Sequence, residues 1–342
     1  MPAFEASSAD RVWLQSISAV KESPDVRLQN GRGGPTFELL HTMLHVHDSR
    51  ERWVTSRDPV MSAPFAIVEV IGILNGRRDS GYLNFFNPVL SKYAGNGAEY
   101  HGAYGYRLRS NAGFDQLERA ANALRANSEG RQVVLQIWDP ATDFPTDIGK
   151  PVAPDIPCNI CSLLKIRQGR LEWSQIMRSN DIFRGLPYNF VQFMTLQEVL
   201  AGWIGIEPGG YTHYADSLHL YREDAERSSS STPLPVMKAL DRLTLPMDHS
   251  NSLWREMNRR VDELATREST EDEYRQLAVM SDGPQAYTNL MALVVADAVR
   301  RRKHPEMAQE IIMLCDNPVL RLLWQRWFER CQRSPSKRLA SV

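Results

Sequence analysis

The two parts of this 342-residue chain carry different secondary-structure patterns, and this difference constrains the fold more than any other feature. Apolar residues alternate in strand-like runs only before about Leu245, whereas residues 251–333 mix acidic and basic side chains and contain few glycines, as helices do. A Ser-rich stretch closed by proline, residues 228–235, provides a junction. The sequence therefore predicts an α+β domain over residues 1–235 and a C-terminal all-helical extension over residues 236–342.

Strand and helix patterns both occur within the first part. Strands are expected at residues 36–47, 131–138, 162–167, 170–177 and 211–221. Helices are expected near the N-terminus, with Asp10 as the cap, and at residues 62–76, 114–126 and 189–204. A Gly-rich loop, residues 30–35, separates the first helix from the first strand. The run at 189–204 is mostly apolar, which indicates a helix buried against the strands.

The composition excludes several classes of protein. The formal net charge is −1, so no overall field recruits nucleic acid or a membrane, and an anionic ligand must be held by local arginines. No apolar run approaches the about 18 residues of a spanning helix, and residues 1–21 lack the apolar core of a signal peptide. The 4 cysteines are too few for a disulfide scaffold of this size, which favours a reducing cytoplasm.

The most informative stretch of the sequence lies between residues 156 and 221. It contains Pro157-Cys158, then Met177-Arg178-Ser179-Asn180-Asp181-Ile182-Phe183-Arg184-Gly185-Leu186-Pro187-Tyr188-Asn189, and finally His219-Leu220-Tyr221. In this order and spacing, the motifs resemble those of the thymidylate synthase superfamily, which includes pyrimidine nucleotide 5-hydroxymethylases. Weaker matches at Glu69, Tyr104-Gly105 and Arg131 extend the resemblance over about residues 30–225.

The resemblance implies a thymidylate synthase-like mixed sheet with packed helices, and methylenetetrahydrofolate-dependent one-carbon transfer to C5 of a pyrimidine nucleoside monophosphate. C5 is a poor nucleophile, and addition of a thiolate to C6 makes it enolate-like. Cys158 matches the family's nucleophile, and Arg178 matches the arginine that activates the thiol and contacts the phosphate. A free thiol has a pKa of about 8.5, so it needs a nearby cation to ionise at neutral pH. Outside the motif, Cys158 would more often be a buried core residue.

Two further residues match catalytic positions of the family. Glu69 lies in an apolar helical run, where burial raises the pKa of a carboxyl toward values useful for proton transfer. The family's matching glutamate organises water and moves protons at the base. Tyr104 matches the tyrosine near the C5 proton. The alternative for Glu69 is a glutamate on the exposed face of the helix, and the alternative for Tyr104 is an aromatic residue that only packs in the core.

The remaining matches concern the ligands. By resemblance, the nucleotide-binding residues are Arg32, Arg131, Ser179, Asn189, His219 and Tyr221, and the folate-binding residues are Asp181 and Gly185. Family members carry a phosphate-binding arginine on the Gly-rich loop. Arg32 is one residue out of register with that position, and Arg27 is the alternative. The alternative for Asp181 is a turn or cap residue, and Asn189 could cap the following helix. Because family members donate the Arg131 equivalent to the neighbouring subunit, the resemblance also implies a homodimer.

The identity of Asn189 bears on the choice of base. An amide offers both a donor and an acceptor, which suits N3–H and O4 of uracil. Cytosine-specific members are expected to carry aspartate at this position. Asn189 therefore favours uracil, although a reversed amide would accept cytosine.

Several positions depart from the family pattern. They are Asn159 in place of a histidine, Leu90 near the position of a tryptophan, Gln132 in place of a second phosphate arginine, Met177 in place of a glutamine, and the tail Arg338–Val342 in place of the peptide that closes over folate. Hydride transfer, which completes methylation, needs a dry and closed site. These departures therefore favour attack by water and a 5-hydroxymethyl product.

Three functions remain open at this level. 5-Hydroxymethylation is preferred, thymidylate synthesis with dihydrofolate formation is the second, and a non-catalytic nucleotide-binding relative is the third. The pair Cys158-x-x-Cys161 lacks a second pair of metal-ligand spacing, so we do not interpret it as a metal site. The loop at residues 31–34 is no Walker loop, because no Gly-Lys-Ser/Thr follows it.

Overall fold

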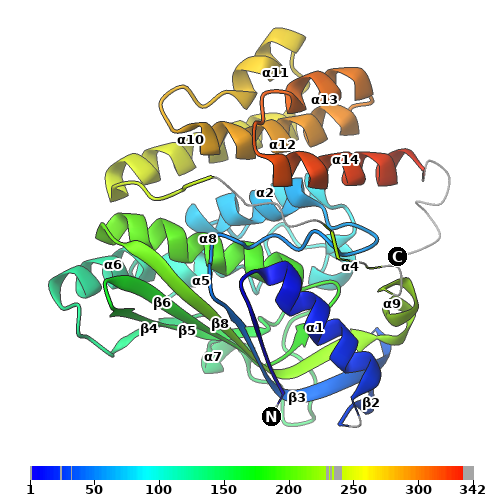
Figure 1. Cartoon of the computed structure of the whole chain (residues 1–342), viewed down its shortest axis with the longest axis vertical. Coiled ribbons are helices and arrows are strands. Elements are labelled where there is room, and N and C mark those ends of the chain that lie inside the picture. The colour runs from blue at the N-terminus through cyan, green and yellow to red at the C-terminus, as the bar shows by residue number, and fades with distance from the viewer. Residues whose placement is uncertain are drawn as a thin grey trace.

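The computed structural model describes residues 2–23, 25–31, 33–228, 231, 233–234 and 241–333. Three layers are stacked in it: a sheet, the long helices that cover one face of the sheet, and the C-terminal helices that cover those (Figure 1). Half of the junction expected at 228–235 lies outside the described residues. None of the described helices is long and apolar enough to cross a membrane.

The sheet is mixed, as the sequence predicts. Its strands follow the order β1-β3-β8-β6-β5-β4, with β2 paired to β3 and β7 paired to β8. The strands are β1 (Ala3–Ala6), β2 (Arg27–Gly31), β3 (Gly34–Val46), β4 (Val133–Gln136), β5 (Asn159–Arg167), β6 (Arg170–Met177), β7 (Asn180–Asp181) and β8 (Glu207–Tyr221). Strand β8 runs antiparallel to β3 and parallel to both β6 and β7. The end of β8 therefore lies beside the ends of two other strands.

Two helices form the middle layer. Helix α2 (Ala63–Leu74) begins where the Ser62 hydroxyl accepts a hydrogen bond from the Phe65 amide, with Pro64 in the first turn. Helix α8 (Leu186–Ile204) is buried along most of its length and ends at Gly205, whose φ of 89° lies in the left-handed region. The two helices pack against each other, and α8 also packs on β6 and β8. The prediction of a buried helix in this region is confirmed.

The other helices of the first part are shorter. They are α1 (Ala9–Glu22), α3 (Gly81–Phe86), α4 (Leu90–Ala94), α5 (Tyr104–Arg109), α6 (Gln116–Ala126), α7 (Pro140–Asp143) and α9 (Arg222–Arg227). Only α1 and α6 among them were expected from the sequence.

Three local expectations are wrong. The cap of α1 is Ser8, because the Asp10 carboxylate instead accepts hydrogen bonds from the amide and hydroxyl of Ser56. Helix α8 begins at Leu186, since Pro187 fits the first turn of a helix, so Asn189 lies inside the helix and is not its cap. Strands β1 and β2 were not expected, because each is short and they pair mainly through backbone groups.

The C-terminal part is all-helical, as the sequence predicts. It consists of α10 (Met247–Thr266), α11 (Glu271–Ala278), α12 (Gln285–Arg301), α13 (Pro305–Ile312) and α14 (Pro318–Gln332). Helix α12 is buried almost throughout and contacts α2, while α10 contacts α2, α3 and α8. Apolar residues of both parts form one continuous hydrophobic core.

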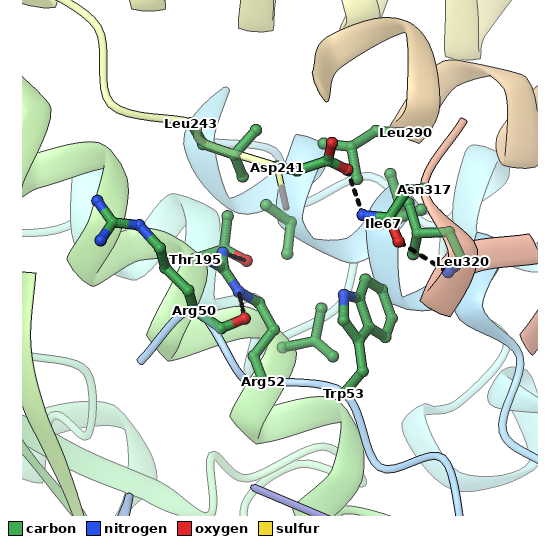
Figure 2. A pocket seen from close by; sticks show the side chains of 12 residues that line it. Arg50, Arg52, Trp53, Ile67, Thr195, Asp241, Leu243, Leu290, Asn317 and Leu320 are labelled. Atoms are coloured by element: carbon green, nitrogen blue, oxygen red, sulfur yellow. Dashed lines mark hydrogen bonds between the residues drawn. The ribbon is translucent and has the colours of Figure 1, made fainter. Parts of the chain in front are cut away.

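A small cavity lies where the two parts meet. It has a volume of about 30 Å³, which is room for roughly two water molecules. Figure 2 shows Arg52 directed toward Thr195 and Asn317 directed toward Asp241 around the cavity. Arg52 donates to the Thr195 hydroxyl at 2.8 Å, and Asn317 donates to the Asp241 carboxylate at 2.6 Å. Cys158 does not line this cavity. The cavity therefore belongs to the packing of the C-terminal helices and not to the expected site.

Candidate active site

Strand register brings Cys158 and Arg178 together. Asn159, the first residue of β5, pairs with Met177, the last residue of β6, so the residues just beyond them also face each other. The Arg178 amide donates to the Cys158 carbonyl at 2.9 Å. The Arg178 side chain donates to the Pro157 carbonyl through Nε at 2.9 Å, and its Nη2 lies 3.9 Å from the Cys158 Sγ. A cation thus lies beside a partly exposed thiol.

Tyr104 interacts electrostatically with both members of this pair and with Glu69. The Glu69 Oε2 on α2 is buried and accepts no hydrogen bond within the described part of the chain. Burial raises the pKa of Glu69 to about 8, which a hydrogen bond from Gln192 partly opposes. Burial, followed by the interaction with Cys158, raises the pKa of Tyr104 well above its ordinary value. The site therefore holds a carboxyl that can exchange a proton near neutral pH and a neutral phenol.

The end of β8 contributes His219 and Tyr221. The Ser179 hydroxyl lies 3.3 Å from Nδ1 of His219, and the rings of His219 and Tyr221 are 5.6 Å apart. A Cβ at Gly33 would lie 3.2 Å from the Tyr221 hydroxyl, so the β2–β3 turn closely approaches this tyrosine. Arg32 belongs to the same turn but lies outside the described residues. The rival Arg27 is exposed on β2.

The two carboxylate oxygens of Asp181 differ in their contacts, and Oδ2 makes only an ion pair with Arg184 Nε at 4.0 Å among the described residues. Its Oδ1 accepts hydrogen bonds from the amides of Phe183 and Arg184, both at 2.7 Å, so it does fix the turn before Gly185 and α8. Its Oδ2 is buried and accepts no hydrogen bond from the described residues. Burial raises the pKa of Asp181, although the two amides oppose this effect. A buried acceptor that receives no hydrogen bond is suited to a ligand that carries N–H groups.

Asn189 is buried with both ends of its amide engaged. Its Oδ1 accepts a hydrogen bond from Asn180 at 2.8 Å, and its Nδ2 donates to Gln192 at 3.2 Å. Each end keeps capacity for one further hydrogen bond. The side chain can therefore offer a ligand one donor and one acceptor.

These residues occupy the segment that matches a known family. The family model described as thymidylate synthase matches residues 13–276, most of the chain. This chain belongs to the thymidylate synthase family.

Several relatives of this family are similar to the chain. Deoxyuridylate hydroxymethyltransferase from Bacillus phage SP01 is 31% identical over 66% of this chain and 60% of its own length. The protein of the same name from Pseudomonas phage M6 is 32% identical over 57% of this chain and 55% of its length. A putative thymidylate synthase from Methanothermobacter marburgensis is 29% identical over 61% of this chain and 88% of its own length. The chain thus spans somewhat over half the length of the two phage relatives.

A solved structure from the family has the same fold. Thymidylate synthase from T4 phage superposes with a TM-score of 0.52 over 66% of this chain and 82% of that chain, at 20% identity.

Arg131 is the family position that lies apart from the other site residues. It is exposed just before β4, the last strand of the sheet, and has no hydrogen bond or ion pair to any described residue. The neighbouring Gln132 is also exposed.

Three buried polar residues were missed by the sequence interpretation: Asn180, Gln192 and His213. All three belong to the hydrogen-bonded surroundings of Asn189. Gln192 follows Asn189 by one helical turn in a mostly apolar helix, and this repeat of amides was the available signal. Asn180 and His213 are far apart in sequence, so only the sheet reveals that they pair.

The C-terminal helix α14 holds the segment that precedes α2. Arg326 donates to the carbonyls of Thr55 and Arg57, the latter at 3.2 Å. The buried Arg57 in turn donates through Nε to the Phe183 carbonyl at 2.8 Å, and its guanidinium lies 4.1 Å from the centre of the Phe183 ring. Contacts therefore lead from α14 to the turn that positions Asp181.

Proposed function

We propose that this protein transfers a one-carbon unit from methylenetetrahydrofolate to C5 of deoxyuridine monophosphate and releases the 5-hydroxymethyl nucleotide. The pairing of Cys158 with Arg178 supports the transfer. The protonatable carboxyl of Glu69, whose Oε2 accepts no hydrogen bond from the described residues, is the single observation that carries the hydroxymethyl outcome. The two phage relatives named deoxyuridylate hydroxymethyltransferase support the same substrate and product.

Cys158 begins the reaction by adding its sulfur to C6 of the pyrimidine. Arg178 favours the thiolate, because a cation 3.9 Å from the sulfur stabilises its negative charge. The side chain of Arg178 is exposed beyond its carbonyl contacts and can reach a phosphate. Ser179, His219 and Tyr221 are the hydroxyl and ring donors left to hold the phosphate and the sugar.

Glu69 and Tyr104 handle the protons. The negative charge that develops on O4 during thiol addition is stabilised by a proton or hydrogen bond from Glu69, whose pKa of about 8 keeps it protonated at neutral pH. Tyr104 keeps its own proton and can orient the proton acceptor that removes the hydrogen from C5 of the pyrimidine. Tyr104 interacts electrostatically with Cys158 and with Glu69, so it lies near both.

The residues present fit methylenetetrahydrofolate. Asp181 Oδ2 is a buried acceptor that receives no hydrogen bond from the described residues, which suits the N–H groups of a pterin. Gly185 sits at the start of α8 with Asn180 and Asp181 about 3 Å from where a Cβ would be, so a larger residue would crowd this turn. When bound, the cofactor supplies the one-carbon unit and, in a methylating enzyme, also the hydride.

Water completes the reaction in our proposal. The oxygen of a water attacks the methylene on C5 while the protonated Glu69 carboxyl passes its own proton to O4 and takes up the proton of that water. Cys158 then leaves as the thiolate, O4 loses its proton, and the C5–C6 double bond forms again. No electrons are gained or lost overall. Glu69 Oε2 is the free acceptor that can hold this water, and the aliphatic Leu90 on α4 covers a folate less well than a tryptophan.

Thymidylate synthesis is the second candidate, and one observation favours it. The Tyr93 hydroxyl on α4 accepts a hydrogen bond from Arg184 at 3.3 Å, so an aromatic ring stands beside the Asp181 turn despite Leu90. A ring at this position could keep folate stacked close to the base. The tail Arg338–Val342, which bears on closure, lies outside the described residues.

A homodimer with Arg131 donated across the interface is also part of the proposal. The layers of helices cover one face of the sheet (Figure 1), and the other face carries partly exposed apolar side chains such as Leu163, Ile176 and Tyr214. Exposed apolar surface of this kind often marks an interface. An arginine without a partner among the described residues of its own subunit is available to a neighbouring phosphate site.

Release of tritium from deoxyuridine monophosphate labelled at C5 tests the transfer step. We expect release that requires both methylenetetrahydrofolate and Cys158, because either product displaces the C5 hydrogen. Nucleotide binding without any release would favour the non-catalytic alternative.

A further inference from the structure

A continuous chain of buried side-chain hydrogen bonds runs behind the base-reading position. His213 Nδ1 lies 3.0 Å from the Tyr211 hydroxyl, and its Nε2 lies 2.9 Å from Asn180 Oδ1. The chain then continues from Asn180 to Asn189 at 2.8 Å and from Asn189 to Gln192 at 3.2 Å, and Gln192 reaches Glu69. We call this chain the amide relay; its members are Tyr211, His213, Asn180, Asn189, Gln192 and Glu69.

The hydrogen bonds of the amide relay all point the same way. His213 is fully buried, and burial lowers its pKa to about 3, so the ring is neutral and one nitrogen donates while the other accepts. Asn180 turns its NH2 group toward Asn189 and its carbonyl oxygen toward His213, so Nε2 is the N–H donor of the ring. Nδ1 is then the acceptor, and the Tyr211 hydroxyl donates to it.

The orientation of each amide in the relay fixes the orientation of the next one. With its oxygen facing His213, Asn180 can only turn its NH2 group toward Asn189, which accepts through Oδ1. Asn189 then donates through Nδ2 to Gln192, and Gln192 donates to the Glu69 carboxyl. A reversed amide at any point would set two donors or two acceptors against each other, which is costly in a buried site.

We propose that His213 is a specificity-determining residue: through Asn180 it locks the Asn189 amide in the orientation that accepts from N3–H and donates to O4 of uracil, and so rejects cytosine. This inference rests on the proposed substrate and deepens it. Cytosine presents an acceptor at N3 and a donor at C4, so it needs the reversed amide. A free asparagine could turn to suit either base, whereas an anchored one cannot.

The amide relay makes a prediction that a purely structural role does not. In Asn180→Asp, the carboxylate accepts from both His213 and Asn189, so Asn189 must turn its NH2 group toward position 180. Gln192 can follow, because the Glu69 carboxyl can donate its proton in place of accepting one. The reversed Asn189 then matches cytosine.

The test measures dissociation constants for dUMP and dCMP by calorimetry in wild type and three variants: Asn180→Asp, His213→Phe and His213→Gln. We expect the wild-type preference for dUMP to fall at least tenfold in His213→Phe and to shift toward dCMP by at least tenfold in Asn180→Asp. His213→Gln should retain the preference, because glutamine can accept from Tyr211 and donate to Asn180 as histidine does. Thermal melting checks that each variant folds.

Two outcomes separate the inference from the proposed function. Equal weakening of dUMP and dCMP in both Asn180→Asp and His213→Phe would overturn the amide relay and leave the proposed function standing. A wild type that prefers dUMP but releases no tritium would contradict the proposed function, while the predicted shifts in Asn180→Asp and His213→Phe would still support the amide relay. Should His213→Phe fail to fold, Asn180→Asp alone decides.

Discussion

The Arg178 guanidinium lies 3.9 Å from the Cys158 sulfur, and it is held there by the backbone that carries the cysteine. Its Nε and Nη2 donate to the carbonyls of Pro157 and Ile156 at 2.9 Å and 3.0 Å. The planar guanidinium can make these contacts and still face the thiol, which a lysine ammonium could not do in the same way. The nucleophile and its cation are therefore positioned before any ligand binds.

The first prediction separates the two neighbouring cysteines. Cys158→Ser should abolish turnover and the covalent adduct with 5-fluorodeoxyuridylate and cofactor, because a hydroxyl beside Arg178 does not ionise at neutral pH. Cys161→Ser is the matched control, since Cys161 lies on β5 three residues further on and is also only partly buried. Denaturing mass spectrometry detects the adduct. An adduct that persists in Cys158→Ser, or that is lost only in Cys161→Ser, would refute the assignment.

The second prediction concerns the pH dependence of stability. The pKa of Glu69 is about 8 in the folded chain, whereas an unfolded glutamate titrates near about 4.3. Between these values the unfolded chain has released a proton that the folded chain keeps, so the free energy of unfolding falls as pH rises, by at most about 1.4 kcal/mol per pH unit. Glu69→Gln removes this dependence.

Urea titrations at about pH 5, 6, 7 and 8 measure this effect, because these pH values lie between the pKa of Glu69 in the unfolded chain and its pKa in the folded chain. The unfolding free energy of wild type should fall relative to that of Glu69→Gln across the series and level off above it. Glu226→Gln, at an exposed glutamate of α9, should run parallel to wild type. Parallel curves for Glu69→Gln as well would show that this carboxyl is ionised in the folded protein.

Much of this arrangement is readable in the sequence, and the reasons differ by element. Strands such as β5 and β6 show alternating burial, so their pattern survives in the sequence, and the Pro157-Cys158 and Arg178-Ser179 motifs fix which ends meet. Helices α3 to α5 are only five or six residues long, too short to show a period. The start of α8 was misplaced because the turn fixed by Asp181 lies directly before it.

The surroundings of the base-reading residue could not be predicted in the same way. The hydrogen bond between Asn180 and His213 spans 33 positions, and it exists because β7 and β8 run parallel in one sheet. An isolated buried histidine is more often interpreted as a packing residue. Only the placed side chains reveal that His213 faces an amide.

The third prediction concerns the C-terminal helix. Arg326→Ala removes two hydrogen bonds from α14 to the carbonyls of Thr55 and Arg57, and charged hydrogen bonds are worth about 1.5–3 kcal/mol each before solvent screening. Since Arg326 is partly exposed, we expect a loss of about 1–2 kcal/mol in unfolding free energy. Because Arg57 leads on to Phe183, the KM for the cofactor should also rise.

Arg333→Ala is the control for this change. Its side chain is 80% exposed and, among the described residues, pairs only with Glu329 at 3.4 Å, so the unfolding free energy should change by less than about 0.5 kcal/mol. Guanidinium melts and cofactor titrations compare the two variants. Equal effects would mean that α14 does not position the segment before α2.

The fourth prediction tests the composite site. Arg131→Ala and Cys158→Ser should each be nearly inactive as separate homodimers, because one lacks a phosphate ligand and the other the nucleophile. After the two are mixed, unfolded and refolded together, hybrids should regain activity, since one of their sites has neither change. Absence of any recovery would place Arg131 in its own subunit's site or outside the site.

The most direct test of the central claim follows the fate of the transferred carbon. The enzyme is incubated with dUMP and methylenetetrahydrofolate while absorbance at about 340 nm reports dihydrofolate, and the mass of the product nucleotide is then measured by mass spectrometry. The product is heavier than dUMP by about 30 Da if water reaches the methylene and a hydroxymethyl group forms, and by about 14 Da if hydride reaches it and a methyl group forms. If Glu69 delivers water, as we propose, the nucleotide gains about 30 Da and the absorbance does not rise. A nucleotide heavier by about 14 Da, formed together with an equal amount of dihydrofolate, would contradict the account and identify a methylating enzyme.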